Sequence, residues 1–218
     1  MNVPGTVRVT GTGMIRLKPD TTVITLTLEG MDPDYAKTLE RSAADTGRIA
    51  DALASVGFAR EELKTRSFRV ETEYEGYQDE GVYRQRLIGY RFRHELRLRF
   101  PSDDERLGRV LSVLASADLT PELGIGYTVN DPEAAKNALI AAAVADAKEK
   151  AEALMKASGT KLGAIRHIGY SLADNAFTVQ PVMLAGSARK LAMDAANLEI
   201  VPEEIEARDV VTVVWEIE

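Results

Sequence analysis

The chain begins with two segments in which apolar and polar residues alternate. Residues 6–17, TVRVTGTGMIRL, and residues 20–30, DTTVITLTLEG, are rich in Val, Ile and Thr. A period of two is typical of half-buried strands, because successive side chains of a strand point to opposite faces. Lys18, Pro19 and Asp20 lie between the segments and predict a turn. The chain is therefore expected to open with two strands.

Residues 32–57 change to the helical period. Asp32 is the expected N-cap, Pro33 suits the first helical position, and Gly57 suits a left-handed stop. The apolar stripe of this helix is expected at Leu39, Ala43, Thr46, Ala50 and Leu53. These spacings place one face of the helix against a core.

Two further segments have the same helical pattern of capping residues and apolar spacing. From residue 102 a shorter helix is predicted, with Ser102 and Glu105 in capping-box positions and a stripe of Leu107, Val110, Leu111 and Leu114. Residues 131–159 predict the longest helix, with Asp131 as cap, Pro132 at the first position and Gly159 as stop. Its inner face is expected at Ile140, Val144, Ala147, Ala151 and Leu154. Because this helix is rich in alanine, its backbone can lie close to a sheet or to another helix.

Residues 62–77 and 82–100 predict two long strands joined by a hairpin tip at 78–81. On the second strand one face carries Tyr90, Phe92, His94, Leu96, Leu98 and Phe100. The opposite face carries Arg91, Arg93, Arg97 and Arg99. Further strands are predicted at residues 120–129, 164–170 and 204–218.

The order of predicted elements defines an α+β fold. We expect a largely antiparallel sheet with three helices on one face, and residues 20–129 have the βαββαβ order of a split, ferredoxin-like unit. The length of 218 residues allows one large domain or two intertwined small ones. We interpret residues 1–218 as a single domain.

Residues 171–203 have no steady period and contain Pro181, Gly186 and Pro202. We therefore predict a long, mobile connection. Loops in compact domains have a median of about 4–6 residues, so a connection of this length suggests either a function or disorder. Its apolar residues predict that part of it packs against another surface. A partner subunit is one candidate for that surface. These candidate oligomer residues are Met183, Leu184, Leu191 and Met193.

Composition narrows the class of protein. The net charge of −7 argues against a general affinity for nucleic acid or anionic membrane, although a local basic patch is compatible with it. The absence of cysteine excludes disulfides and thiolate catalysis. No apolar run approaches the roughly 20 residues that cross a bilayer, so no transmembrane segment is expected. No export signal is visible, which suggests a cytoplasmic protein, or a periplasmic one if the chain is a trimmed form.

Motifs that carry chemistry are scarce. The runs GTGMIR at 11–16 and GIGYTV at 124–129 do not complete a phosphate loop before a helix, and we interpret them as sites of close packing or a bulge. His94 is expected in the core or at an edge rather than in catalysis, and His167 has no partners at metal-ligand spacing. No G-x-S-x-G elbow occurs. We therefore assign no catalytic residue, cofactor or metal.

The alternating charges of the hairpin have two interpretations. Glu71, Glu73 and Glu75 could hold a cation, but cross-strand pairing with Arg84 and Arg86 explains them better. The row formed by Arg91, Arg93, Arg97 and Arg99, with Arg66 and Arg69 beside it, is a candidate binding face. The aromatic side chains lie on the opposite face of the strand, which disfavours nucleic-acid binding. A solvated or intersubunit face is favoured over a polyanion site.

Several of these segments together resemble the SIMPL domain family, a group of bacterial envelope proteins with some animal relatives. They are VRVTGTGMIRLKPDTTVITLTLEG, ALASVGFAREELKTRSFRV, GYRFRHELRLRF and ALIAAAVADAKEKAEALMKASGTKLGAI, and they span nearly the whole chain. The resemblance implies an α+β domain that tends to self-associate, and it implies no established enzymatic reaction. The animal relatives are signalling adaptors, which favours a protein-interaction role.

Three functional hypotheses follow. The first is a non-enzymatic, self-associating scaffold or interaction domain, related by family analogy to envelope or stress physiology. The second is a ligand-binding or polyanion-binding module that uses the arginine-bearing sheet face. The third, an enzyme, would require a pocket that joins His94 or His167 to a carboxylate.

Overall fold

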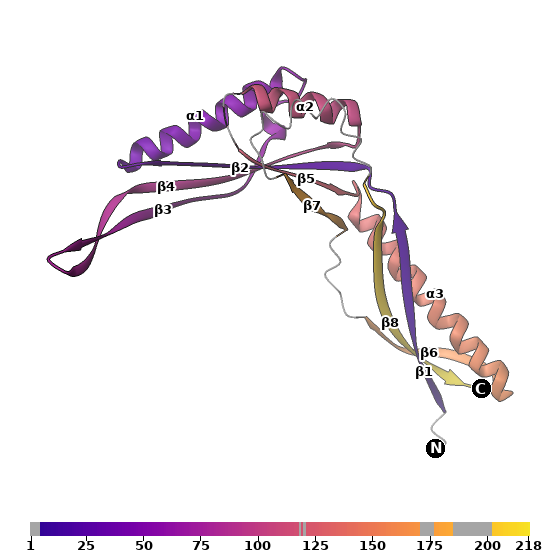
Figure 1. Cartoon of the computed structure of the whole chain (residues 1–218). Coiled ribbons are helices and arrows are strands. Elements are labelled where there is room, and N and C mark those ends of the chain that lie inside the picture. Colours follow the sequence, from indigo (N-terminus) through magenta and orange to yellow (C-terminus); the bar gives the residue numbers. More distant parts are fainter. Residues whose placement is uncertain (1–4, 118, 120, 171–176, 185–201) are drawn as a thin grey trace. The chain divides into compact units, whose positions relative to one another are not determined.

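The computed structural model describes residues 5–117, 119, 121–170, 177–184 and 202–218. Within them the chain forms a three-stranded sheet and a five-stranded sheet with α-helices (Figure 1). The α+β class is confirmed. The elements are β1 (Thr6–Leu17), β2 (Thr21–Asp32), α1 (Tyr35–Ala54), the 3₁₀ helix η1 (Arg60–Glu62), β3 (Lys64–Asp79), β4 (Val82–Pro101), α2 (Asp104–Ser116), β5 (Glu122–Thr128), α3 (Pro132–Ser158), β6 (Leu162–Tyr170), β7 (Thr178–Leu184) and β8 (Ile205–Ile217).

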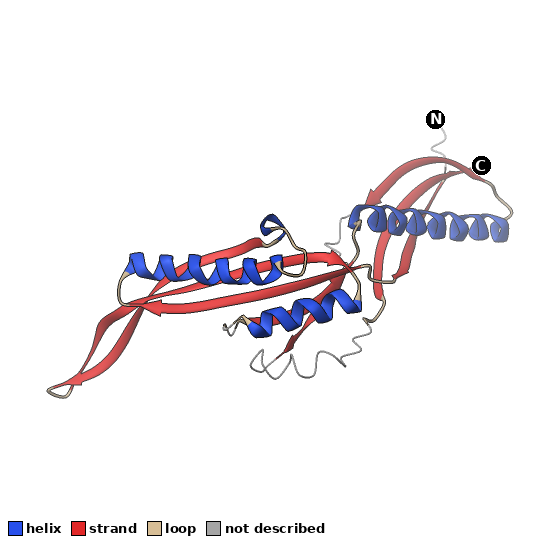
Figure 2. Ribbon diagram, turned by 90° about the horizontal axis from the view of Figure 1, so that it is seen from above, coloured by secondary structure: helices blue, strands red, loops and turns tan. Residues whose placement is uncertain are grey.

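The five-stranded sheet has the order β3-β4-β2-β5-β7. Its first four strands come from the predicted βαββαβ segment, and their spatial order is that of a split, ferredoxin-like unit, which confirms this part of the prediction. Strand β4 pairs antiparallel with β2 and with β3. Helices α1 and α2 cover one face of the sheet (Figure 2). Apolar side chains of this face and of both helices are buried, among them Ile24, Leu98, Ile49 and Val110.

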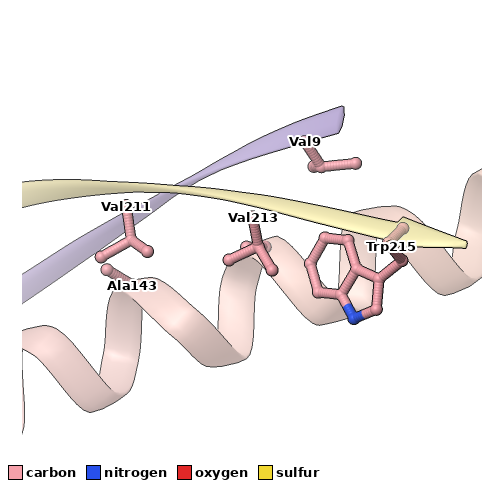
Figure 3. Packing of buried hydrophobic residues seen from close by; sticks show 7 residues of the cluster. Val9, Ala143, Val211, Val213 and Trp215 are labelled. Carbon is pink, nitrogen blue, oxygen red and sulfur yellow. The ribbon is translucent and has the colours of Figure 1, made fainter. Parts of the chain in front are cut away.

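The three-stranded sheet has the order β1-β8-β6, and both pairs are antiparallel. Helix α3 packs against β1 and β8. Figure 3 shows Val211, Val213 and Trp215 of β8 and Val9 of β1 along the side of the sheet that faces α3, with Ala143 of the helix beside Val211; all five are buried. The three predicted helices are therefore divided between two sheets instead of lying on one. Periodicity marks a buried face, but it does not reveal which sheet covers that face.

Two glycines of β1 explain how closely α3 approaches the sheet. A Cβ atom on Gly11 would overlap the carbonyl oxygen of Ala143, and one on Gly13 would overlap that of Leu139. The interpretation of the GTG run as a site of close packing is confirmed. Because α3 turns the residues at this contact towards the sheet, the contact determines which face of the helix is buried. The buried residues are Ala135, Leu139, Ala143, Ala147, Ala151 and Met155.

The predicted inner face of α3 was therefore partly wrong. Ala147 and Ala151 are buried as expected, whereas Leu154 is exposed and Ile140 and Val144 are only half-buried. Close approach to glycine favours small side chains at the contact, so alanines replace the larger residues there. The predicted ends of α3 are confirmed: Asp131 accepts a hydrogen bond from the Ala134 amide at 2.8 Å, and Gly159 adopts the left-handed conformation.

Helix α1 begins two residues later than predicted. Its N-cap is Asp34, whose carboxylate accepts a hydrogen bond from the Lys37 amide at 3.0 Å, and Asp32 instead accepts one from the Asp34 amide. The buried stripe is Thr38, Ser42, Asp45, Ile49, Ala50 and Leu53. Ala50 and Leu53 were predicted correctly, but Leu39, Ala43 and Thr46 were not. The spacing of apolar residues could not predict this face, because three of its six buried residues, Thr38, Ser42 and Asp45, are polar.

Helix α2 has the predicted stripe, and its cap lies one residue later than expected. Asp103 accepts a hydrogen bond from the Arg106 amide at 2.6 Å. The hydroxyl of Ser102 lies 3.1 Å from that of Thr22 on β2. Ser102 therefore links the helix start to the sheet and does not cap the helix.

The predicted hairpin between β3 and β4 is confirmed. Its tip, Glu80 and Gly81, has φ values of 48° and 80°, the left-handed pair typical of a two-residue hairpin turn. The predicted connection at 171–203 contains a strand, β7, that lies at the edge of the five-stranded sheet. Pro181 obscured this strand in the sequence, although an edge strand tolerates a residue that cannot donate to the ladder.

The chain divides into two compact units. One consists of residues 1–19, 128–179 and 203–218, and the other of residues 20–127 and 180–202. The first contains the three-stranded sheet with α3, and the second contains the split βαββαβ unit. The interpretation of the chain as one domain stays a prediction.

Candidate functional site

The face of the five-stranded sheet opposite α1 and α2 is the first candidate site. Phe92, Leu96, Leu98 and Phe100 of β4 are buried beneath the helices. Side chains alternate along a strand, so the arginines of β4 lie on the other face. The sequence thus assigned the two faces of β4 correctly.

Half of the arginine row, Arg91 and Arg93, is neutralised by carboxylates of neighbouring strands. Arg91 pairs with Glu73 of β3, and Arg93 pairs with Glu29 of β2 and, at 3.2 Å, with Glu122 of β5. The hydrogen bond and the charge of Glu73 raise the pKa of Arg91. These pairs join four strands across the open face.

The predicted pairing of the hairpin glutamates is confirmed for Glu75, which pairs with Arg86 at 2.6 Å. Arg84 pairs instead with Asp79, at 3.4 Å. No three His, Asp or Glu side chains come together to hold a metal ion in the part of the chain that the structure describes.

The end of the arginine row that contains Arg97 and Arg99 differs in its charge pairing. Within the described ranges, Lys64, Arg97 and Arg99 form no ion pair. Arg97 lies directly opposite Lys64 of β3 on one side and Thr25 of β2 on the other. The Nε atom of Arg97 is buried and has no hydrogen-bond partner. The row predicted as one face therefore consists of a paired part and an unpaired part.

His94 lies on the helix side of β4 in a cluster of hydroxyl groups. Thr46 donates a hydrogen bond to the Ser42 carbonyl at 2.8 Å, and its oxygen lies 3.1 Å from Nδ1 of His94. The hydroxyl of Thr65 lies 2.8 Å from Nε2. This arrangement suits a neutral ring that donates from Nδ1 to Thr46 and accepts at Nε2 from Thr65. Burial lowers the pKa of His94, which favours the same neutral form.

The outer part of the β3–β4 hairpin is a second candidate surface, which the sequence analysis missed. We define residues 74–87 as the hairpin arm, and Figures 1 and 2 show that it extends beyond the end of α1. The cross-strand register gives the arm two distinct faces. The uncharged face is Tyr74, Gly76, Gln78, Tyr83, Gln85 and Leu87. The charged face is Glu75, Tyr77, Asp79, Val82, Arg84 and Arg86.

Three large apolar side chains of the uncharged face are exposed to solvent. Tyr83, Tyr74 and Leu87 have exposed fractions of 69%, 55% and 47%. A Cβ atom on Gly76 would overlap the hydroxyl group of Tyr83, so the ring lies across that glycine. The alternation is visible in the sequence, but a register shift between Glu73 and Tyr74 decides which residues share a face. That shift was not predictable from the pattern.

The candidate oligomer residues of the predicted connection are only partly placed. Met183 and Leu184 belong to β7. Leu191 and Met193 lie outside the described residues. Their role in association stays a prediction.

The fold defines the class of protein: an α+β chain built on a split βαββαβ unit with a second antiparallel sheet. The sequence profile of the SIMPL family, described as a protein of unknown function (DUF541), matches residues 7–215. The chain belongs to the SIMPL family. Among curated proteins, none matches it significantly. None of the helices in the described part of the chain has the length and apolar character needed to cross a bilayer.

Proposed function

We propose that this protein is a non-enzymatic, self-associating interaction protein and that two copies meet through the uncharged face of the hairpin arm. The observation that carries the proposal is the exposure of Tyr74, Tyr83 and Leu87 on one side of a two-stranded ribbon. Contiguous exposed apolar groups are typical of interaction sites. An isolated two-stranded hairpin is also only marginally stable in water, so a partner would stabilise the arm.

The charge distribution favours a second copy as that partner. The chain carries a net charge of −7, so two copies repel one another in general. The uncharged face contains no ionisable group other than tyrosine, and the ion pairs of Arg86 with Glu75 and of Arg84 with Asp79 lie on the other side. Two such faces can meet about a two-fold axis without burying a charge. Tyrosine is also among the residues enriched at interfaces.

The test is the molar mass in solution, measured by light scattering behind size exclusion. The intact chain is expected at a multiple of 23.8 kDa. Replacing Tyr74, Tyr83 and Leu87 by serine is expected to return it to the mass of one chain. The matched control, Tyr77→Ser with Val82→Ser, changes exposed apolar residues of the charged face and should keep the assembly. Circular dichroism verifies that every variant is folded.

Two results would contradict the proposal. One is a mass of 23.8 kDa for the intact chain at every concentration. The other is an assembly that survives the triple substitution. A further variant, with residues 185–201 replaced by a Gly-Ser linker, tests the alternative contact through the predicted connection. If only this variant dissociates, the interface lies there and the hairpin arm is excluded.

A further inference from the structure

The three cations at the end of the arginine row, Lys64, Arg97 and Arg99, lie on one face of two neighbouring strands, β3 and β4. Arg97 stands between Lys64 and Thr25 in the register, and Arg99 follows on the same face two residues later. Directly opposed residues on paired strands have Cβ atoms about 4.5–5.5 Å apart, and like charges at that distance destabilise a sheet. Farther along the strand, Arg91 and Arg93 meet carboxylates. Arg69 of β3 also lies opposite a cation, but that cation, Arg93, is itself paired with Glu29 and Glu122. At the other end Lys64 and Arg97 face each other, and neither has a carboxylate partner within the described residues.

The nearest acidic side chain on the same strand face does not relieve this repulsion. Glu95, two residues before Arg97, accepts hydrogen bonds from Arg66 at 2.8 Å and from Ser67 at 3.4 Å. The Nε atom of Arg97 remains buried and without a partner. A buried charged donor that is not hydrogen-bonded is costly, and native structures nearly always satisfy such groups with protein, water or an ion. An anion at this place would satisfy the Arg97 donor and would also offset the repulsion between Lys64 and Arg97.

The chemistry of the groups selects the kind of anion. A guanidinium presents a planar fork of donors that matches the oxygens of a phosphate, and an ammonium adds a second charged donor. Thr25 can add a neutral hydroxyl donor from β2. Three positive charges suit a doubly charged phosphate better than a single carboxylate. The buried aromatic residues of β4 lie on the opposite face, so no base-stacking platform accompanies the cations.

We propose that Lys64, Arg97, Arg99 and Thr25 form a binding site for the phosphate group of a small phosphate or phosphomonoester. The site is built within one unit of the chain, and it does not depend on the hairpin arm or on self-association. Free phosphate esters and the headgroup of phosphatidic acid present the same chemistry. The experiment therefore includes a soluble probe and a membrane probe.

The first measurement is a calorimetric titration of the intact chain with inorganic phosphate at low salt. Arg97→Gln and Lys64→Gln are each expected to weaken binding about tenfold or more, because each removes a charged donor. Arg91→Gln is the matched control. It removes one positive charge from the same face of the same strand, but its usual partner is Glu73, so the affinity for phosphate should change less than about twofold.

A second measurement separates ligand binding from folding. In phosphate-free buffer, Arg97→Met is expected to unfold at the same urea concentration as the intact chain or at a higher one, because it removes an unpartnered buried donor. Added phosphate should shift the midpoint of the intact chain upward and leave that of Arg97→Met unchanged. Equal shifts for both proteins, or none for either, would overturn the proposal.

The two sources of phosphate are distinguished by cosedimentation with phosphatidylcholine vesicles, with or without phosphatidic acid. Binding that requires phosphatidic acid and Arg97 assigns the site to a headgroup. Binding to inorganic phosphate without vesicle binding assigns it to a soluble phosphate compound. If the intact chain binds neither probe, or if Arg91→Gln weakens binding as much as Arg97→Gln does, the site does not exist as described.

Discussion

At the scale of single residues, His94 is the titratable group whose surroundings are best defined. Its ring nitrogens contact the hydroxyls of Thr46, Ser42 and Thr65, and Phe68 meets the ring edge-on at 5.1 Å between centroids. A hydroxyl can donate or accept, but it cannot neutralise an imidazolium. The hydroxyls can satisfy both nitrogens of the neutral ring, and burial lowers the pKa of His94 because desolvation disfavours the charged imidazolium.

This environment predicts a dependence of stability on pH. The histidine of the unfolded chain has a pKa near 6.5 and takes up its proton at a higher pH than the folded one. The free energy of unfolding should therefore be largest above about pH 6.5 and should fall as the pH drops through that value towards the folded pKa. Replacing His94 by glutamine should reduce this loss, at a cost of about 1 kcal/mol at pH 8 from weakened hydrogen bonds. Urea unfolding between pH 8 and about pH 5.5 measures both effects.

His167 supplies the control for this experiment. It lies on β6 with an exposed side chain, and it is the only other histidine of the chain. His167→Gln makes the same change of residue type at an exposed position and is measured beside His94→Gln. An unchanged slope in His94→Gln would contradict the assignment.

The helix caps show the limit of residue-scale prediction. A short polar cap was predicted for each helix, and in the structure an aspartate caps all three. The position was correct only for Asp131, while Asp34 and Asp103 replace the predicted Asp32 and Ser102. Neighbouring capping residues are chemically equivalent, and the backbone conformation decides which of them points along the helix.

At the scale of elements, the contact between β1 and α3 depends on the absence of side-chain atoms. Gly11 and Gly13 bring the strand backbone against the alanines of the helix. The resulting close packing leaves no room for a methyl group. Such a contact cannot relax by rotation of a side chain, because backbone atoms lie on both sides.

We therefore predict that Gly11→Ala lowers the free energy of unfolding by about 1–3 kcal/mol through overpacking. Gly108→Ala in α2 is the matched control, because nothing lies within 4 Å of its new methyl group. Alanine is favoured over glycine within a helix, so this variant should be more stable by about 0.5–1 kcal/mol. Urea unfolding of both proteins gives the comparison. Equal stability of Gly11→Ala and the intact chain would contradict the close packing.

Element types were more predictable than the faces they bury. Periodicity identified the helices, the hairpin and the βαββαβ order. It misassigned part of the buried faces of α1 and α3, because Thr38, Ser42 and Asp45 are buried polar residues and because alanines face the glycines of β1. Strand β7 was missed because its short segment contains a proline and its ladder lies at a sheet edge.

At the scale of the whole molecule, the chain contains two compact units, each with its own buried apolar residues. Trp215 is the only tryptophan of the chain, and it lies in the cluster between α3 and the three-stranded sheet. Its fluorescence therefore reports on that unit. Circular dichroism reports on the helices and strands of both units.

This difference allows a test of how independently the units unfold. Leu98 is fully buried in the five-stranded sheet unit, and Leu98→Ala is expected to cost about 2–5 kcal/mol. We expect the circular-dichroism transition to begin at lower urea while the midpoint of Trp215 fluorescence changes little. Leu139→Ala, in the core beneath α3, should shift the fluorescence midpoint. Identical shifts of both signals in both variants would mean that the chain unfolds as one cooperative domain.

The sequence by itself determined the α+β class, the split βαββαβ order, the helix ends at Asp131 and Gly159, and the separation of arginines from apolar residues on β4. These features follow from local periodicity and from the conformational preferences of single residues, which act over a few positions of the chain. The tertiary structure alone decided which helix covers which sheet, that Arg91 and Arg93 meet carboxylates while Arg97 and Lys64 face each other, and which side of the hairpin arm is uncharged. Those outcomes depend on strand register and on contacts between distant segments, and a local pattern contains neither.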